Sequence, residues 1–217
     1  CSGQSIEYVK KFGLNLPNAM SIAKPPKHPE VLIEQVIKFS AALQGHYAGA
    51  IGWDAVNTFL SPYLVGVDDA RMHQLAQILV YEYAQQAVAR GGQSIFSDLN
   101  IYWETPKHFV GVPAIGPGGE YTGKNYEDYE TESQRFAMAL MDVYLEGDAN
   151  GRPFFFPKPE VHITDRFFQT PGHEEFMEKV CRLSAEMGNT YFVFDRGDTA
   201  RVSECCRLSF NLDEQDL

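Results

Sequence analysis

Cysteine is scarce in this sequence, and long apolar runs are missing from it. Four cysteines among 217 residues, two of them adjacent, are too few for the disulfide framework of a small secreted domain, and this favours a reducing compartment. No apolar run reaches the roughly 18 residues that cross a bilayer, and the first residues do not resemble a signal peptide. We therefore expect a soluble, cytoplasmic protein with no membrane partner.

Basic residues are also few. Lysine and arginine number 18 against 29 aspartates and glutamates, for a net charge of −11, so the chain has no general positive field that would hold nucleic acid. An anionic ligand would have to be bound by local donors. Apolar residues at 44% and charged residues at 22% are typical of a globular protein, and we expect residues 1–217 to fold as a single domain.

Sequence motifs of metal sites and of serine hydrolases are absent. The cysteines form no C-x-x-C pair and no H-E-x-x-H occurs, so we expect no metal site. The nucleophile elbow G-x-S-x-G is missing as well, and this gives no support to serine hydrolase chemistry.

The pattern of apolar residues changes along the chain. Helical spacing predicts a short helix near the start and four longer ones, and near-alternation or short apolar runs predict strands between them. Residues 1–92 are expected to be mainly helical, and residues 93–217 to alternate strand and helix and to end in a cysteine-bearing loop. This order predicts an α/β fold with parallel strands and a site at their carboxyl ends. The longer helices are expected at residues 29–43, 69–90, 129–146 and 171–187, and the strands at residues 93–103, 152–157 and 190–194.

A glycine-rich segment at residues 118–125 fits the phosphate-loop pattern G-x-x-x-x-G-K only in part. Asn125 stands where the pattern needs a Ser or Thr hydroxyl for magnesium, and Glu120 adds a negative charge inside the loop. We expect a solvent-exposed loop here, and an NTPase that uses residues 118–124 is the alternative.

The cysteines allow several interpretations. Cys1 could be an N-terminal nucleophile, a lipid-bearing residue, or an interior residue of a longer chain that was cut here, and we favour the last. Arg201 and Arg207 flank the pair Cys205-Cys206 and would favour a thiolate suited to nucleophilic or redox work. The alternative is a pair of small, buried, inert residues. Cys181, in the middle of a predicted helix, is expected to be buried and inert.

Six short segments, taken together, resemble the anaerobic, oxygen-sensitive (class III) ribonucleoside-triphosphate reductases. The resemblance runs in order from Cys1 to about Phe210. The segments are Lys-Pro-Pro-Lys-His at 24–28, Leu-Gln-Gly at 43–45 with Ala-Gly-Ala at 48–50, Ser-Pro-Tyr at 61–63, Gly-Gly-Gln-Ser-Ile-Phe-Ser at 91–97, Gly-Asp at 147–148 with Gly-Arg-Pro-Phe-Phe-Phe-Pro at 151–157, and Cys-Cys-Arg-Leu at 205–208.

The resemblance implies part of a ten-stranded α/β barrel of the glycyl-radical type. A loop running through that barrel would present Cys206 to the substrate ribose, and Cys1 looks like the second active-site cysteine. Cys206 would take and return the hydrogen at the 3′ carbon, while Cys1 would supply a reducing hydrogen as the 2′ hydroxyl leaves as water. The two sulfurs should therefore approach each other inside the barrel, while Cys181 stays in its helix.

The strand at 93–103 supplies the candidate substrate-binding residues. Its polar side, which we interpret as uncharged, could donate hydrogen bonds to ribose hydroxyls or phosphate without a carboxylate's repulsion. An equally favoured alternative is that these side chains satisfy neighbouring groups inside the barrel. The residues are Gln93, Ser94, Ser97 and Asn100.

The sequence also departs from the family. The family stores its radical on a glycine in an R-x-x-G-Y segment, and no Gly-Tyr pair occurs here; the four-cysteine zinc site and the ATP-binding regulatory domain are missing too. We expect a central fragment that holds no cofactor itself and is inactive alone. The implied partners are a ribonucleoside triphosphate, a regulatory ATP or dNTP, a second copy in a homodimer, a radical-S-adenosylmethionine activating enzyme and the remaining reductase segments. The electron donor and the preferred base stay open.

A different class of function is also compatible with these features. The chain could be a non-catalytic nucleotide-binding or assembly module, because the regulatory dNTP of the family binds among helices at a dimer interface. The helices that begin near Pro29 and Asp68 are the candidates for such a site.

Overall fold

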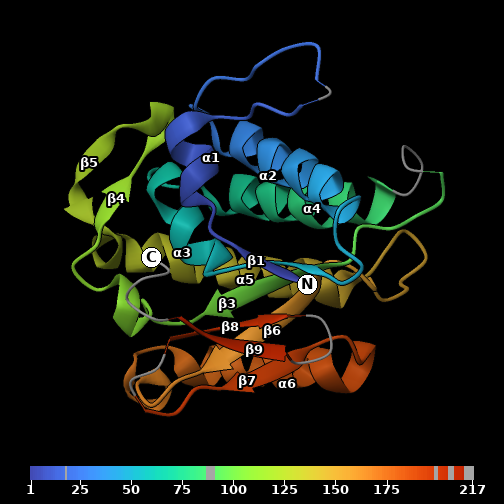
Figure 1. The fold of residues 1–217 in the computed structure, drawn as a ribbon. Helices are drawn as coiled ribbons and strands as arrows, with labels where there is room; N and C mark the ends of the chain where they lie inside the picture. The colour runs from blue at the N-terminus through green and yellow to red at the C-terminus, as the bar shows by residue number, and fades with distance from the viewer. Residues whose placement is uncertain (18, 87–90, 198–199, 205–207, 213–217) are drawn as a thin grey trace.

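The centre of the molecule is a parallel β-sheet (Figure 1). The computed structural model describes residues 1–17, 19–86, 91–197, 200–204 and 208–212. Within these ranges, five parallel strands pair in the order β1-β2-β3-β6-β7, so β1 and β7 are the outer strands. The α/β class expected from the sequence is confirmed. The strands are β1 (Ser2–Gln4), β2 (Ile51–Trp53), β3 (Ser97–Tyr102), β6 (Lys158–Ile163) and β7 (Tyr191–Phe194).

The predicted helices are present, and their ends follow from local chemistry. The Asp68 side chain accepts a hydrogen bond from the Arg71 amide at 2.8 Å and so caps one helix. Two others end at Gly147 and Gly188, which adopt φ angles of 71° and 69° that favour glycine. No helix in the described ranges is long and apolar enough to cross a membrane. The helices are α1 (Glu7–Phe12), α2 (Pro29–Gln44), α3 (Val56–Leu60), α4 (Asp69–Gln85), α5 (Glu130–Glu146) and α6 (His173–Met187).

Two strands of the sheet come from the part of the chain that the sequence pattern predicts to be helical. β1 and β2 have three residues each, which is too short to show the alternation by which a strand is recognised. In β2 the glycine at position 52 also interrupts any apolar run. The segment at residues 45–50 thus leads into an inner strand of the sheet.

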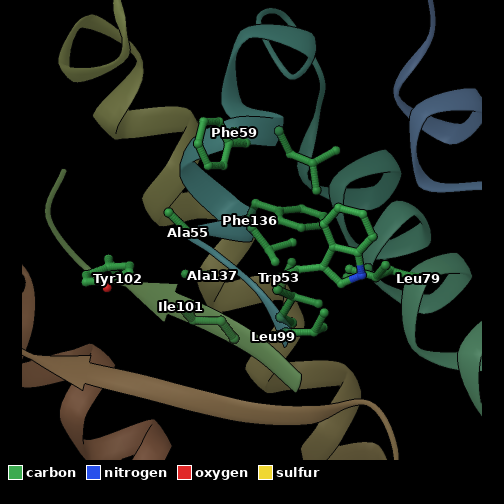
Figure 2. Close-up of a cluster of buried hydrophobic side chains, with 14 of the residues drawn as sticks. Trp53, Ala55, Phe59, Leu79, Leu99, Ile101, Tyr102, Phe136 and Ala137 are labelled. Atoms are coloured by element: carbon green, nitrogen blue, oxygen red, sulfur yellow. The ribbon is translucent and has the colours of Figure 1, made fainter. Parts of the chain in front are cut away.

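The core lies between one face of the sheet and helices α1 to α6, and Figure 2 shows part of it. At its centre the hydroxyl of Ser40 accepts a hydrogen bond from the Trp53 indole at 2.8 Å and lies 2.8 Å from the Tyr83 hydroxyl. One serine thereby satisfies two large aromatic side chains that are buried with it, and it ties α2 to β2 and α4. Removing that hydroxyl would leave both groups without this partner in an apolar environment.

The apolar strand predicted at residues 152–157 is wrong. The strand in this region, β6, begins one residue later, at Lys158. Carbonyl groups of the predicted segment are bound by side chains instead of by a neighbouring strand: Asn189 donates to the Phe154 carbonyl at 3.1 Å and Tyr144 to the Pro157 carbonyl at 2.7 Å. The segment is therefore a loop that leads into the sheet.

The glycine-rich segment does not form a phosphate-binding loop. Residues 117–119 make one 3₁₀ turn, and strand β5 (Tyr121–Asn125) follows, paired antiparallel with β4 (Pro113–Ile115). A phosphate loop needs a helix directly after its glycines, so that the helix amino terminus faces the anion. Residues 120–124 are exposed, as expected, but Gly116 and Gly119 are buried, and residues 121–125 form a strand instead of the expected loop.

A second hairpin lies in front of the sheet in Figure 1. Strand β8 (Ala200–Glu204) pairs antiparallel with β9 (Leu208–Leu212). β8 contacts β1, β2 and β3 on the face opposite to the helices. Strand β8 therefore lies across the sheet and ends directly before Cys205 and Cys206, which are outside the described residues.

Candidate functional site

The two faces of the sheet differ in chemistry. Because successive side chains of a strand point to opposite sides, the apolar residues of β3 and β6 that belong to the helical core share one face, including Leu99, Ile101, Val161 and Ile163. The alternate residues form the other face, which we call the inner face. On β1, β2, β3 and β6 its members are Gly3, Gly52, Asp98, Asn100, Tyr102, Lys158, Glu160 and His162.

The inner face carries no side chain over the central residues of β1 and β2, and it carries polar side chains over β3 and β6. Gly3 and Gly52 are register partners, so β1 and β2 present no side chain there, and β8 lies against them. Asp98 and Lys158 are register partners on β3 and β6, and their charged groups lie 2.9 Å apart. Both side chains are buried.

Glu160 continues this row of charged groups along β6. Its carboxylate lies 3.5 Å from the Lys158 ammonium, and its side chain is hydrogen bonded to that of Ser203. Burial, together with the Asp98 charge, raises the pKa of Glu160. Burial alone would lower the pKa of Lys158, but the Asp98 and Glu160 carboxylates outweigh it and raise that pKa.

A hydrogen-bonded chain crosses the sheet one step further along. His162 Nε2 lies 2.6 Å from Asn100 Oδ1, and His162 Nδ1 lies 2.6 Å from Asp195 Oδ2. Asn100 and His162 are fully buried, and the Tyr102 ring stacks on the imidazole at a centroid distance of 4.1 Å. Asp195 follows β7 directly, so this chain connects β3, β6 and the end of β7.

Asn100 also binds strand β8. The Ser203 amide donates to Asn100 Oδ1 at 3.0 Å, and Asn100 Nδ2 donates to the Ser203 carbonyl at 3.1 Å. The same Nδ2 donates to the Trp53 carbonyl at 3.1 Å. One carboxamide therefore joins the backbones of β2 and β8 across the inner face.

The carboxyl ends of the strands carry further buried acids. Glu104 accepts a hydrogen bond from the Thr164 hydroxyl, and burial raises its pKa. Asp54 lies 3.5 Å from His108 Nε2. Burial raises the pKa of Tyr102 well above its usual value, and the nearby carboxylates of Asp54, Asp195 and Glu104 add to this. Among the described residues no group of three or more His, Cys, Asp or Glu side chains is arranged to hold a metal ion.

The four substrate-binding residues expected from the sequence do not lie together. Asn100 is on the inner face. Ser97 is buried on the opposite face, where its hydroxyl donates to the Ile95 carbonyl at 3.4 Å. Gln93 is exposed and precedes the strand, and Ser94 lines a cavity of about 390 Å³ beside Tyr81 and Phe154. The polar side of β3 is also not uncharged, because Asp98 lies on it.

The structure describes Cys1 and Cys181, whereas Cys205 and Cys206 lie outside the described residues. Cys1 directly precedes β1, and its sulfur and backbone nitrogen lie close to Gly49, so a side chain at position 49 would collide with Cys1. Cys181 is in α6, as expected, but it is exposed rather than buried. The helix turns its apolar stripe, which includes Phe176 and Val180, toward the core and leaves Cys181 on the other side. The separation of Cys1 and Cys206 involves residues outside the described ranges.

Sequence reasoning missed most of the charged inner face. The signal was present: Lys158, Glu160 and His162 alternate with Pro159, Val161 and Ile163, which is the period of a strand with one polar face. The aromatic run at residues 154–156 favours a strand that ends just before this pattern begins. Asp98 lies within the strand predicted at 93–103, on the side that is predicted to be uncharged.

Comparisons with known proteins agree on one family. The model of the anaerobic ribonucleoside-triphosphate reductase family matches residues 1–216. No curated protein sequence matches the chain. The anaerobic ribonucleotide reductase from Thermotoga maritima with citrate in the active site is similar in structure, with a TM-score of 0.64 and 17% identity over 89% of this chain and 35% of that one.

Two further solved structures are similar to the same extent. The Thermotoga maritima enzyme in complex with dATP and CTP gives a TM-score of 0.62 at 17% identity, over 89% of this chain and 33% of that one. Another anaerobic ribonucleotide reductase gives 0.61 at 16% identity, over 88% and 30%. This chain thus spans about a third of the length of these structures, and the likeness concerns the fold.

Proposed function

The chain belongs to the anaerobic ribonucleoside-triphosphate reductase family, and we propose that it forms the part of the catalytic barrel that carries two active-site cysteines. The observation that carries the proposal is the position of β8. This strand leads directly into Cys205-Cys206 and is bound to the inner face through Ser203. Cys1 comes two residues before Gly3, and if the alternation of β1 extended to it, its side chain would lie on the same face.

In the proposed reaction the two cysteines have different roles. Cys206 takes the hydrogen from the 3′ carbon of the ribose and later returns it, and Cys1 supplies a reducing hydrogen as the 2′ hydroxyl leaves as water. An S–H bond is close in strength to the C–H bond that is broken, which makes a cysteine sulfur suitable for the first step. The family stores its radical on a glycine of an R-x-x-G-Y segment, and this sequence has no Gly-Tyr pair.

The inner face would provide the surroundings for this chemistry. Its side chains are buried, and they are held by hydrogen bonds and ion pairs to one another. Such a site excludes water and fixes the reacting groups in position. The sheet described above would be half of a ten-stranded barrel, completed by the remaining reductase segments.

The substrate would be a ribonucleoside triphosphate, and a dNTP would regulate the choice of base. Support comes from similar structures, one described as a complex with dATP and CTP and one as having dATP in a specificity site. Helices α2 and α4 are the candidates for the regulatory site and for a homodimer interface.

Reconstitution tests the proposal. The chain is combined with the remaining reductase segments, including the R-x-x-G-Y segment activated by a radical-S-adenosylmethionine enzyme, and CTP reduction is measured without oxygen. We expect activity with the wild-type chain and none with Cys206→Ser or Cys1→Ser. Cys181→Ser, on the exposed side of α6, is the matched control and should be fully active.

Reduction by Cys206→Ser, or by the 217-residue chain alone, would refute the proposed mechanism. Nucleotide binding without any reduction would favour the non-catalytic module.

A further inference from the structure

The hydrogen bonds around Asn100 define which of its side-chain atoms is the oxygen. The Ser203 amide can only donate, and it faces Oδ1 at 3.0 Å. The carbonyls of Trp53 and Ser203 can only accept, and both face Nδ2 at 3.1 Å. The carboxamide therefore has one orientation that satisfies all three backbone groups.

This orientation determines the protonation of His162 at one nitrogen. Because Oδ1 of Asn100 accepts, His162 Nε2 must carry a hydrogen to bind it at 2.6 Å. The other nitrogen, Nδ1, faces Oδ2 of Asp195 at 2.6 Å. A second proton must lie between Nδ1 and the carboxylate, since a bare nitrogen and a carboxylate oxygen would repel each other at this distance. No hydrogen bond of the described residues reaches the other oxygen of Asp195.

We propose that Asn100, His162 and Asp195 form a clamp that positions strand β8, and thereby the cysteine-bearing loop, over the inner face. Asn100 holds the backbone of β8 at Ser203, His162 holds Asn100, and Asp195 holds His162 through the shared proton. This inference rests on the proposed function for the role of Cys206, but the clamp itself is a property of the described residues. Its members are positioning residues, and they do not need to touch the substrate.

The clamp depends on the contact between His162 and Asp195. Without the Asp195 carboxylate, the 2.6 Å contact at His162 Nδ1 is lost, so the imidazole can turn and Asn100 loses its support.

Hydrogen exchange measures the clamp without any enzyme activity. The protection of the backbone of residues 200–204 is measured in the full chain at a single pH, with α5 as the reference for global folding. We expect Asn100→Ala to lower this protection at least about tenfold, because two hydrogen bonds to Ser203 are lost. Asp165→Asn changes an exposed carboxylate near Arg196 and is the matched control.

A second pair of variants tests the contact between Asp195 and His162. Asp195→Ala removes the partner of His162 Nδ1, so the protection of residues 200–204 should fall, whereas the carboxamide of Asp195→Asn can still bind Nδ1 and should keep most of the wild-type protection. Protection equal to wild type in Asn100→Ala, or in Asp195→Ala, would overturn the proposal. If Asn100→Ala also exposes α5, the comparison of Asp195→Ala with Asp195→Asn decides.

Kinetics in the reconstituted enzyme distinguish positioning from substrate binding. A positioning role predicts that Asn100→Ala lowers kcat and leaves KM for CTP nearly unchanged. A rise in KM at constant kcat would assign Asn100 to the substrate instead and overturn its role as a clamp. Failure of the proposed function would leave no activity in wild type, while the exchange results would stand.

Discussion

The ammonium group of Lys158 lies 2.9 Å from the Asp98 carboxylate on the neighbouring strand, and both side chains are buried. The two residues are register partners in the parallel sheet, so their contact is set by strand pairing. Glu160 adds a second carboxylate 3.5 Å from the same ammonium. The centre of the inner face therefore holds two acids on either side of one lysine.

Replacing this lysine should destabilise the fold strongly. Lys158→Met leaves Asp98 and Glu160 with no cation between them, and the loss of one partner of a buried pair costs about 3–5 kcal/mol. Urea unfolding of the purified chain measures the change in the free energy of unfolding. Lys38→Met, which breaks an exposed pair with Glu34, should cost no more than about 0.5 kcal/mol. Equal effects of the two substitutions would contradict this account.

The pH dependence of stability should carry the signature of Lys10. Its side chain is fully buried, and burial lowers its pKa from 10.5 to about 7. Between these values the unfolded chain binds a proton that the folded chain does not, so stability rises with pH, by up to about 1.4 kcal/mol per unit. Lys10→Met should remove this rise between pH 7.5 and 9.5 in urea unfolding.

Lys11→Met is the matched control for that experiment. It retains Lys10 and removes the neighbouring lysine, which donates to the Gly119 carbonyl at 2.9 Å. We expect it to keep the wild-type dependence on pH. An unchanged dependence in Lys10→Met would show that Lys10 stays protonated inside the fold.

Gly49→Ala should impair the active site more than the fold. A Cβ at this position would overlap the sulfur of Cys1 and lie 2.9 Å from its backbone nitrogen, so Cys1 must move. We expect CTP reduction in the reconstituted enzyme to fall at least about tenfold, because a displacement of about 1 Å in a reacting group can cost about a hundredfold. In Gly45→Ala the new Cβ would meet only the Ala42 carbonyl, at 3.5 Å, and activity should be retained. Full activity of Gly49→Ala would separate Cys1 from the chemistry.

Cys181 should react readily in the native state. Its thiol is exposed on α6, so a thiol reagent should label it without prior unfolding, and Cys181→Ser should change the free energy of unfolding by less than about 0.5 kcal/mol. Peptide mass spectrometry after brief alkylation identifies the labelled residue. Labelling of Cys181 only in urea would show that its thiol is buried in the folded chain, as its apolar neighbours in the sequence predict.

The long helices could be predicted from the sequence because their apolar period extends over several turns and their ends carry recognisable residues. Asp68 at the start of α4 and Gly188 after α6 are examples. The strands β1 and β2 could not be predicted in the same way. Three residues show no period, and their pairing depends on partners 40 or more positions away, such as Ile51 with Ser97.

The inner face was harder to predict because its residues satisfy one another. Asn100 lies next to His162 only through the pairing of β3 with β6, and Asp195 joins them from beyond β7. A buried acid, amide and imidazole far apart in the sequence give no local motif. The cysteine pair and the family resemblance predict a cysteine-bearing loop, but the residues that bind the strand before it became visible only in three dimensions.

Strand β7 forms one edge of the five-stranded sheet. It pairs with β6 on one side, no described strand covers its other side, and Phe194 at its end is 58% exposed. Free backbone groups along such an edge can pair with another chain, so the isolated polypeptide should self-associate. Its net charge of −11 opposes this by repulsion, which salt screens. Aggregation should therefore increase with ionic strength, and a polypeptide that supplies the next strand should suppress it.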